Sequence, residues 1–409
     1  MAAEEPIVVL KYTAVEVLRD KWWIAMVALG IALVATPIVR AIAYRARIVD
    51  RPDDLLKPHG RPVAYLGGLA ICLGLLAGLA CHATLLPLGQ HWCEIRRGIA
   101  ARDFSILAHN PLWNIMAIAL SGILITITGL VDDLCNITPR QKICGQIAAA
   151  GVLLLGGIGT GMISMFLAPL GIVVPLWLLL ILRTLFCLLL VICACNATNL
   201  LDGLDGLCGG VTGIIALGYL ALAVFLAMFG RVPEMDGLRV GLCLAMVGAV
   251  LGFLPYNIPP ASIFMGDAGS MLLGFFVATM MAMFCHEASA RWFLAACVVF
   301  ALPILDTALA VVRRTLSGTR IFSGDRSHLY DQLVDRGMSV KQVVVLFYAL
   351  SILAGAIGVL SAIFLRLRYA VVLYALGFAA IWVLFYKLGM VQPPPRPPGP
   401  PKPLDPKEE

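Results

Sequence analysis

The sequence predicts an all-α, polytopic integral membrane protein with about eleven transmembrane helices. Of the 409 residues, 61% are hydrophobic and 13% are charged, and the mean hydropathy is +0.94. Soluble domains carry about 25% charged residues, so this composition excludes that class. Apolar runs of roughly 20 residues recur along the chain, which favours membrane-crossing helices over the alternating strands of a barrel.

Eleven apolar runs are read as spans, at residues 22–43, 63–88, 112–130, 143–158, 176–195, 207–229, 239–254, 270–286, 292–312, 343–365 and 369–388. An odd number of crossings places the termini on opposite sides of the membrane. We therefore expect an external segment (residues 1–21), a membrane domain (22–390) and a cytoplasmic tail (391–409). The nine prolines of the tail predict an extended, disordered segment.

The basic residues indicate the orientation, because cytoplasmic loops carry an excess of Lys and Arg. With the C-terminus inside, 18 of the 30 Lys and Arg residues fall in cytoplasmic segments, 11 fall outside, and Arg183 lies within a span. All the polar motifs described below then face the cytoplasm.

The most informative stretch runs from Asn196 to Leu207 and sets four polar residues between long apolar runs. Asn196, Asn199, Asp202 and Asp205 are spaced three apart, so on a helix they form one slowly winding stripe. Such a stripe suits a hard cation and a polar ligand. The alternative is a set of caps at the start of the next helix.

Two carboxylate motifs lie at the same side of the membrane. Asp132 and Asp133 are adjacent at the end of a span, where their side chains diverge by about 100°, so one is expected to serve a metal or nucleophile while the other orients it. Asp267 is placed between Gly266 and Gly269, where a carboxylate caps a helix or binds a ligand near exposed backbone.

Three further groups complete the polar pattern. Lys57 and His59 precede a Gly-Gly pair, which suits either a ligand or a basic loop followed by close helix packing. Asp306 lies within a span and must face protein or water. Arg326 and His328 lie in a loop, where they suit a clamp on phosphate oxygens unless the loop is merely solvated.

Together, these motifs resemble the polyprenyl-phosphate N-acetylhexosamine-1-phosphate transferases of glycosyltransferase family 4. Five motifs occur in the family's order between Asp50 and Gly337: the Lys/His loop with Gly-Gly, the Asp pair, NxxNxxDGxDGL, FMGDxGS and the Arg/His loop. The resemblance implies transfer of N-acetylhexosamine 1-phosphate, expected to be the N-acetylglucosamine form, from a UDP-sugar to polyprenyl (undecaprenyl) phosphate with release of UMP. This would be the first membrane step of envelope polysaccharide synthesis.

The resemblance also implies residue roles. Asn199 and Asp267 would hold Mg²⁺, with Mn²⁺ as a substitute, while Phe264 would stack on uracil and Asp205 or its neighbouring backbone would read its ring. Asp132 and Asp133 would face the lipid phosphate, and Asp202 would support the metal and ribose. Arg326 and His328 would meet the pyrophosphate. The catalytic set is then Asp132, Asp133, Asp202 and His328, and the substrate-binding set is Lys57, His59, Asn196, Asp205, Phe264, Asp306 and Arg326.

One departure bears on the substrate. Many relatives carry further histidines in the last loop, where this chain has Tyr330 and Asp331. Phospho-N-acetylmuramoyl-pentapeptide transfer is therefore the second choice, followed by an ion-coupled transporter. The expected partners are a UDP-sugar, the lipid phosphate and the membrane, with a possible homodimer and no nucleic acid. The expected location is the plasma membrane, with a cytoplasmic active site.

The orientation can be tested with reporter fusions. A reporter that is active only outside the cytoplasm should be silent after Lys407 and active when placed before Trp22, because the basic residues hold the C-terminal side inside. The reverse pattern of activity would overturn this orientation.

Overall fold

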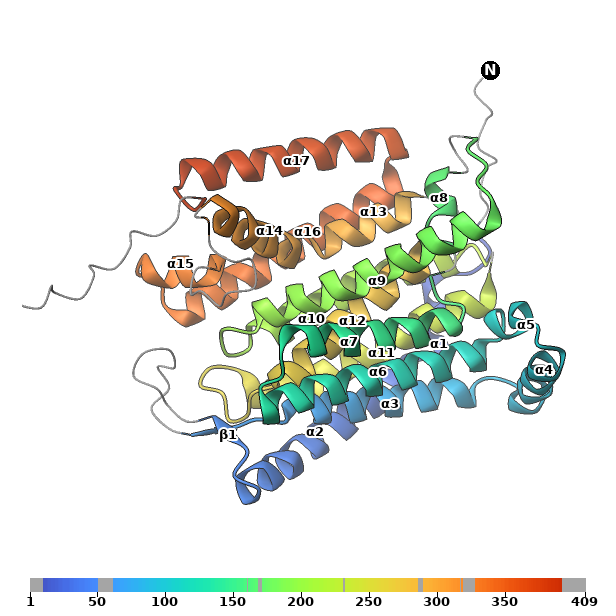
Figure 1. The fold of residues 1–409 in the computed structure, drawn as a ribbon, viewed down its shortest axis with the longest axis horizontal. Coiled ribbons are helices and arrows are strands. Elements are labelled where there is room, and N and C mark those ends of the chain that lie inside the picture. Colours follow the sequence, from blue (N-terminus) through green and yellow to red (C-terminus); the bar gives the residue numbers. More distant parts are fainter. Residues whose placement is uncertain are drawn as a thin grey trace, which may run out of the picture.

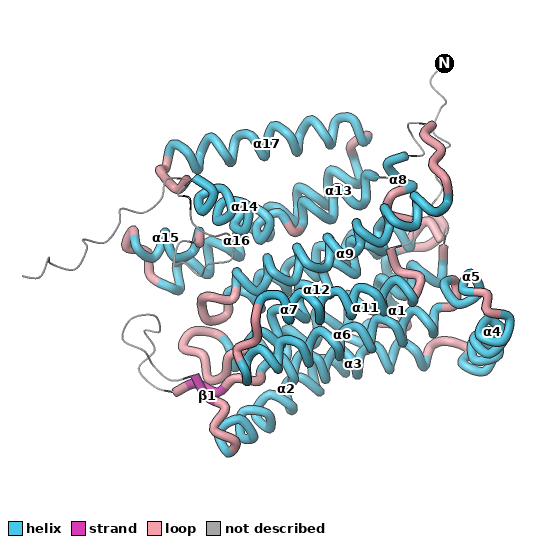
Figure 2. Tube along the Cα trace, viewed as in Figure 1, coloured by secondary structure: helices cyan, strands magenta, loops and turns pink. Residues whose placement is uncertain are grey.

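The computed structural model describes residues 10–50, 62–159, 161–167, 171–230, 232–285, 290–316, 318 and 328–391. Nearly all regular structure in this part of the chain is helical (Figure 2). The helices are α1 (Ala14–Arg19), α2 (Trp22–Arg45), α3 (Gly67–Thr84), α4 (Leu88–Ala101), α5 (Phe104–Ala108), α6 (Pro111–Cys135), α7 (Pro139–Leu155), α8 (Ser164–Leu167), α9 (Leu176–Leu201), α10 (Leu207–Ala227), α11 (Pro233–Asn257), α12 (Gly266–Phe284), α13 (Ala290–Val299), α14 (Ala301–Leu316), α15 (Leu329–Asp335), α16 (Val340–Phe364) and α17 (Leu367–Lys387). Strands β1 (Val49–Asp50) and β2 (Val63–Ala64) pair antiparallel.

The prediction of an all-α polytopic membrane protein is confirmed. Within the described residues, nine helical segments are long and apolar enough to cross a membrane, and the bent pair α13–α14 makes ten. The remaining run, predicted at residues 143–158, falls largely on α7, whose 17 residues are slightly short of a full span. The long helices run side by side in one bundle (Figure 1).

The predicted span at residues 292–312 is not one straight helix. It consists of α13 and α14, which meet at an angle of 71°. Pro303 explains the break, because it has no N–H to donate to the carbonyl of Val299, four residues earlier, and its ring crowds that carbonyl. The sequence contained this signal, and the expectation of a continuous span overlooked it.

Helix α12 occupies the centre of the bundle. It packs against α3, α6 and α9, and every one of its residues except Asp267 is buried. Asp267 lies in the first turn, so the central helix carries its one accessible side chain at its N-terminal end.

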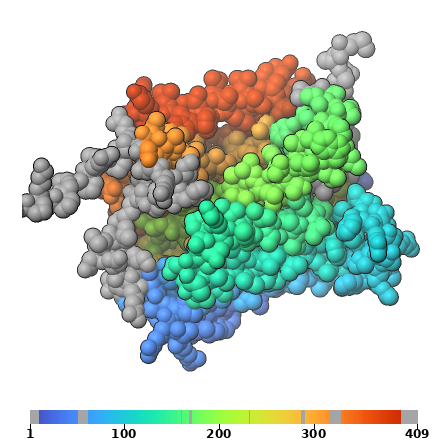
Figure 3. All heavy atoms as spheres, in the orientation of Figure 1, coloured from blue at the N-terminus to red at the C-terminus, as the bar shows by residue number. Residues whose placement is uncertain are grey.

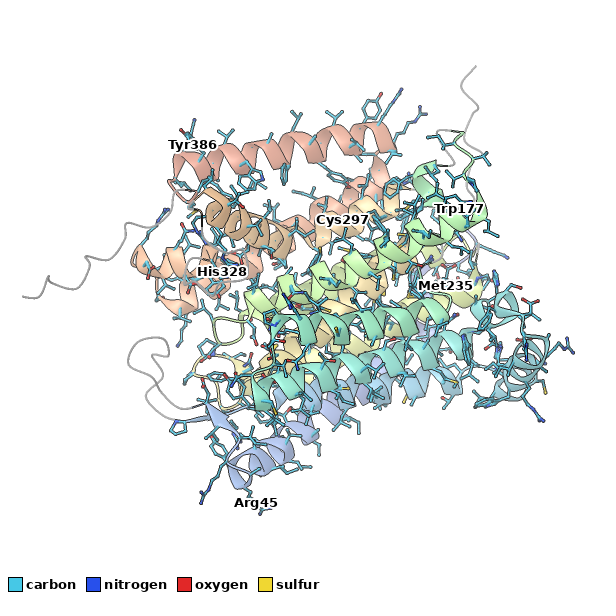
Figure 4. All side chains as sticks on the ribbon, in the orientation of Figure 1. Arg45, Trp177, Met235, Cys297, His328 and Tyr386 are labelled. Carbon is cyan, nitrogen blue, oxygen red and sulfur yellow. The ribbon has the colours of Figure 1, made fainter. Side chains whose placement is uncertain are left out.

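The bundle has two distinct ends. Figure 4 places Arg45, His328 and Tyr386 at one end, and Trp177 and Met235 at the other. We call the first the site end and the second the far end. Lys11 donates its backbone N–H to Met228 just after α10, whereas Gln332 contacts Met390 at the site end. The described chain thus starts and finishes at opposite ends, as the odd number of predicted crossings requires.

A buried ion pair lies near the far end. Arg239 is fully buried in α11, and its Nη1 donates to Asp236 Oδ1 at 2.9 Å. Its Nη2 donates to the Met283 carbonyl near the end of α12 at 2.7 Å. An arginine within a span is costly unless its donors are satisfied, and here it ties α11 to α12.

Close contacts between helices depend on small residues. A Cβ built on Gly68 would collide with the backbone of Gly269 and Ala268, and one on Gly129 would meet Asp267 and Ala268. These glycines let α3 and α6 approach α12 backbone to backbone at the site end, as is common in membrane helix packing. Gly68 is therefore a packing residue, which is one of the two expectations for the Gly-Gly pair.

Gly68→Ala should destabilise the protein by about 3 kcal/mol, the upper end of the usual range for overpacking, because the backbone it meets cannot move aside as a side chain could. Its melting temperature in detergent should fall markedly. Gly30→Ala in α2 is the control, because no atom lies within 4 Å of the added methyl group. That variant should be neutral or stabilised by up to about 1 kcal/mol. Equal melting temperatures would contradict the contact.

Candidate active site

Four helix ends meet around one lysine. Helix α7 starts with a capping box in which Thr138 and Gln141 bond reciprocally, and Lys142 follows directly. The Lys142 ammonium pairs with Asp132 on α6 at 2.8 Å and with Asp267 on α12. It also donates to Asn199 Oδ1 on α9 at 3.3 Å. One cation thus connects α6, α7, α9 and α12.

The oxygen atoms around this ammonium are also suitable ligands for a metal. Asn199 Nδ2 donates to Asp267 Oδ1 at 2.7 Å and to Ser270 Oγ at 3.0 Å, which holds the Asn199 and Asp267 side chains together. Mg²⁺ prefers such carboxylate and amide oxygens, usually one or two carboxylates with water and phosphate. In the described part of the chain, no three His, Cys, Asp or Glu side chains form a metal cluster. The residues fit a cation shared with a phosphate ligand, rather than a closed protein cage.

Asp133 has a different partner from Asp132. Its carboxylate accepts from the backbone N–H groups of Asp267 at 2.8 Å and Ala268 at 3.1 Å, so it caps α12 from another helix. The preceding Gly266 has φ +68 and packs against that carboxylate. A carboxylate is favourable at the positive end of a helix. The cap expected from Asp267 is therefore supplied by Asp133.

Asp132 points the other way, as the divergence of adjacent helical side chains predicts. Its Oδ1 accepts from the Ile137 N–H at 3.0 Å, just after the left-handed Asn136 that ends α6. Its Oδ2 faces Lys142. This carboxylate fixes the turn between α6 and α7 and orients the lysine.

The predicted stripe of four polar residues is interrupted. Helix α9 ends at Leu201, so Asn196 and Asn199 share a helix while Asp202 and Asp205 lie in the loop before α10. Gly206, with φ +75, allows that loop to turn. Asp205 Oδ2 accepts from the Ala261 N–H at 2.8 Å and so joins this loop to the segment after α11.

Negative charge accumulates around the Asp202 loop. Burial raises the pKa of Asp202 well above its ordinary value, and the charges of Asp267, Asp133 and Asp205 raise it further. Burial also raises the pKa of the Tyr65 hydroxyl, again with nearby carboxylates contributing. The neighbouring carboxylates that contribute to both shifts are the groups that a bound cation would offset.

A pocket of about 490 Å³ opens beside the carboxylates. Its walls are Arg47, Ile48, Val49, Asp50, Tyr65, Asp132, Asp133, Leu134, Asn136 and Asp267. Phe264 is half-buried next to it and meets Tyr65 edge to face, with ring centroids 5.8 Å apart. Among the described residues, the pocket therefore combines an acidic wall with Arg47 and Tyr65, and Phe264 packs behind Tyr65.

His328 and Asp306 form a second buried group. Asp306, only 1% exposed, lies 3.0 Å from His328 Nδ1 and accepts from the Leu329 N–H at 2.6 Å. The Tyr330 ring stacks on His328, with centroids 5.6 Å apart, and its hydroxyl donates to the Leu200 carbonyl at 3.2 Å. Asp306 therefore holds the start of α15, and Tyr330 joins α15 to the end of α9.

The remaining predicted residues divide into two groups. Asn196 faces the bundle interior, where its Nδ2 donates to Gln146 Oε1 at 3.1 Å, one turn away from the contact between Lys142 and Asn199. Lys57, His59 and Arg326 lie outside the described residues.

Sequence reasoning missed Lys142 and Tyr65. Lys142 was counted only as one of the basic residues that set the orientation. Its available signal was its position one turn into a helix on the same side as every acidic motif. Tyr65 directly precedes the Gly-Gly segment, and nothing in its local sequence distinguishes it.

Lys142→Met should leave Asp132 and Asp267 as unscreened neighbours. We expect a stability loss of about 2 kcal/mol without divalent ions, below the 3–5 kcal/mol typical of fully buried pairs. Added Mg²⁺ should raise the melting temperature of this variant more than that of the wild type, because it replaces the missing positive charge. Arg140→Met, an exposed position in the same helix, is the control. If Mg²⁺ raised the melting temperatures of Lys142→Met and the wild type equally, the idea that Mg²⁺ takes the position of the Lys142 ammonium would be contradicted.

Comparison with known proteins agrees with this geometry. Residues 115–285 match the family described as glycosyl transferase family 4. Decaprenyl-phosphate N-acetylglucosaminephosphotransferase of Mycobacterium leprae is 33% identical over 86% of this chain and 86% of its own length. A probable undecaprenyl-phosphate N-acetylglucosaminyl 1-phosphate transferase of Bacillus subtilis is 29% identical over 83% and 84%.

A shorter likeness covers less of the chain. Phospho-N-acetylmuramoyl-pentapeptide-transferase of Staphylococcus aureus (strain Newman) is 37% identical over 164 residues, which are 40% of this chain and 47% of that protein. The matched family region contains the Asp132, Lys142, Asn199 and Asp267 cluster. The chain therefore belongs to glycosyl transferase family 4, the family of polyprenyl-phosphate N-acetylhexosamine-1-phosphate transferases that its motifs resemble.

Proposed function

We propose that this protein transfers N-acetylglucosamine 1-phosphate from UDP-N-acetylglucosamine to a polyprenyl phosphate and releases UMP. The observation that carries the proposal is the cluster of Lys142, Asp132, Asn199 and Asp267 beside a pocket at one end of a membrane bundle. The sugar and the lipid class are taken from the names of the two relatives that match over most of their length. The site end would face the cytoplasm of a plasma membrane, where the product starts an envelope polysaccharide.

The reaction exchanges one phosphoric anhydride for another. An oxygen of the polyprenyl phosphate attacks the phosphorus that bears the sugar, and the bond from that phosphorus to the bridging oxygen breaks. UMP departs with the bridging oxygen and its electrons. Phosphoryl transfer depends mainly on positioning and on neutralising negative charge.

The described residues suit that requirement. A Mg²⁺ held by Asn199 and Asp267 would neutralise charge on the diphosphate. Lys142 provides a fixed positive charge at the same place, and Asp132 orients it. A phosphate monoester has a second pKa near 6 and is mostly dianionic at pH 7, so a general base adds little. Asp132 therefore acts chiefly through the position of Lys142.

The aromatic pair supports a nucleotide-binding role for the pocket. Phe264 and Tyr65 meet edge to face next to the acidic wall. A uracil ring would stack on an aromatic ring face of this kind. Asp205, in the neighbouring loop, would read the uracil ring. His328 and Asp306 would organise the loop that meets the pyrophosphate.

Two alternatives fit less well. A pentapeptide-bearing substrate is suggested by a relative that matches only 40% of the chain, and the histidines typical of that branch are replaced by Tyr330 and Asp331. An ion-coupled transporter would place its site near the membrane midplane. Here, Asp132 and Asp267 lie at the last and first turns of their helices.

The proposal can be tested with purified protein in detergent. A panel of UDP-sugars with undecaprenyl phosphate should give one dominant lipid product by mass spectrometry, a diphosphate-linked N-acetylhexosamine. Asp267→Asn should lower kcat by on the order of 10² or more, because it removes charge where the metal is expected. Asp335→Asn, exposed at the end of α15, should retain activity. Full activity of Asp267→Asn, or no lipid product from any of the UDP-sugars, would refute the assignment.

A further inference from the structure

We propose that α4, at the far end, is a surface that binds anionic phospholipid in the leaflet opposite the active site. The proposal does not depend on the transferase reaction. Helix α4 follows the end of the span α3 after three residues, and α5 is followed by the span α6 after two. Figure 1 shows α4 turned across the direction of α3 and α6, and Figure 3 shows it projecting at that end of the molecule. Its position between two spans places it at the membrane surface.

The helix is held firmly in this position. Asn110, which caps α6, donates from Nδ2 to Glu94 Oε2 at 2.8 Å and to the His91 carbonyl at 3.2 Å. Ile95 packs with Leu107 of α5 and Leu112 of α6 in a small separate core. Contacts from two helices therefore fix both the position and the rotation of α4 against the bundle.

An apolar stripe remains uncovered on the outside of this helix. Leu88 is 40% exposed, Trp92 49% and Ile99 57%. At about 100° per residue the three side chains lie within about 40° of one another, and next to the buried stripe of His91, Ile95 and Gly98. A stripe that continues the apolar side of a surface helix suits the acyl region of a bilayer, and tryptophan favours that depth.

The arginines of α4 indicate that the lipid bound along the apolar stripe has an anionic headgroup. Arg96, Arg97 and Arg102 are exposed on α4 and at its end. The two acidic residues nearby are already engaged, because Glu94 bonds Asn110 and Asp103 caps α5. Arg96 lies about 40° round the helix from Trp92, and Arg97 lies further round on the polar side. An arginine beside an apolar stripe suits the phosphate of an anionic headgroup, with the acyl chains lying along Leu88, Trp92 and Ile99, and a second arginine on the polar side adds to the attraction.

The first test is photocrosslinking of the full-length protein in nanodiscs of phosphatidylcholine and phosphatidylglycerol. The variants Trp92→p-benzoylphenylalanine and Ile99→p-benzoylphenylalanine should form lipid adducts at several times the yield of the same replacement at Cys93 or Ala101. These two control positions are exposed on other faces of α4. Equal yields at all four positions, or no adduct at residues 92 and 99, would overturn the proposal.

The second test concerns the headgroup. Adducts formed at residue 92 should contain more phosphatidylglycerol than the bulk lipid does. Arg96→Gln with Arg97→Gln should reduce this enrichment by at least about fivefold, since each arginine near an anionic surface contributes roughly that factor. Arg366→Gln with Arg368→Gln removes two charges elsewhere and should leave the enrichment unchanged. Adducts that match the bulk lipid ratio in the wild type would overturn the anionic assignment.

Discussion

Charged side chains among packed membrane helices are stable only when they are paired, and the Lys142 ammonium supplies the positive charge that pairs the carboxylates at the site end. Unpaired ions in a medium of low polarity are strongly unfavourable, whereas a well-bonded group of opposite charges is tolerated. Lys142 faces Asp132 and Asp267 and is completed by Asn199, so each of four helices contributes one side chain. A shift of any of these helices by one turn would leave a carboxylate or the ammonium without its partner. The same group that a ligand would use thus also determines how the helices align.

Backbone proximity makes this arrangement possible. Gly68 and Gly129 let α3 and α6 touch the first turn of α12, and that contact brings Asp133 onto its exposed N–H groups. Because the N–H groups of Asp267 and Ala268 donate to Asp133, they are not available to the Asp267 carboxylate. The Asp267 side chain is therefore left facing Lys142 and Asn199. The close helix packing, the cap on α12 and the position of the Asp267 carboxylate therefore all depend on the small residues where α3 and α6 cross α12.

The sequence predicted the helical membrane architecture because composition and run length report directly on a lipid environment. It also singled out Asp132, Asn199 and Asp267, because polar groups between apolar runs have few structural reasons to be there. The fold brings these three side chains together, and their roles in metal and substrate binding stay predictions. It could not reveal that Lys142 joins them, since a basic residue near a helix start resembles any charge that sets orientation. It also could not reveal the pairing of Asp306, within α14, with His328, at the start of α15. These partners are 22 residues apart in the sequence, so no helical periodicity links them.

The complete burial of α12 has a consequence for how the protein tolerates its surroundings. Bilayers differ in thickness, and proteins adjust to the mismatch by tilting or by deforming the lipid around them. Helices α9 and α17 carry most of their surface outward, so such adjustments act on them first. Helix α12, in contrast, is surrounded by protein on every side. Asp267 is thereby separated by a layer of protein from the lipid-facing helices on which such adjustments act.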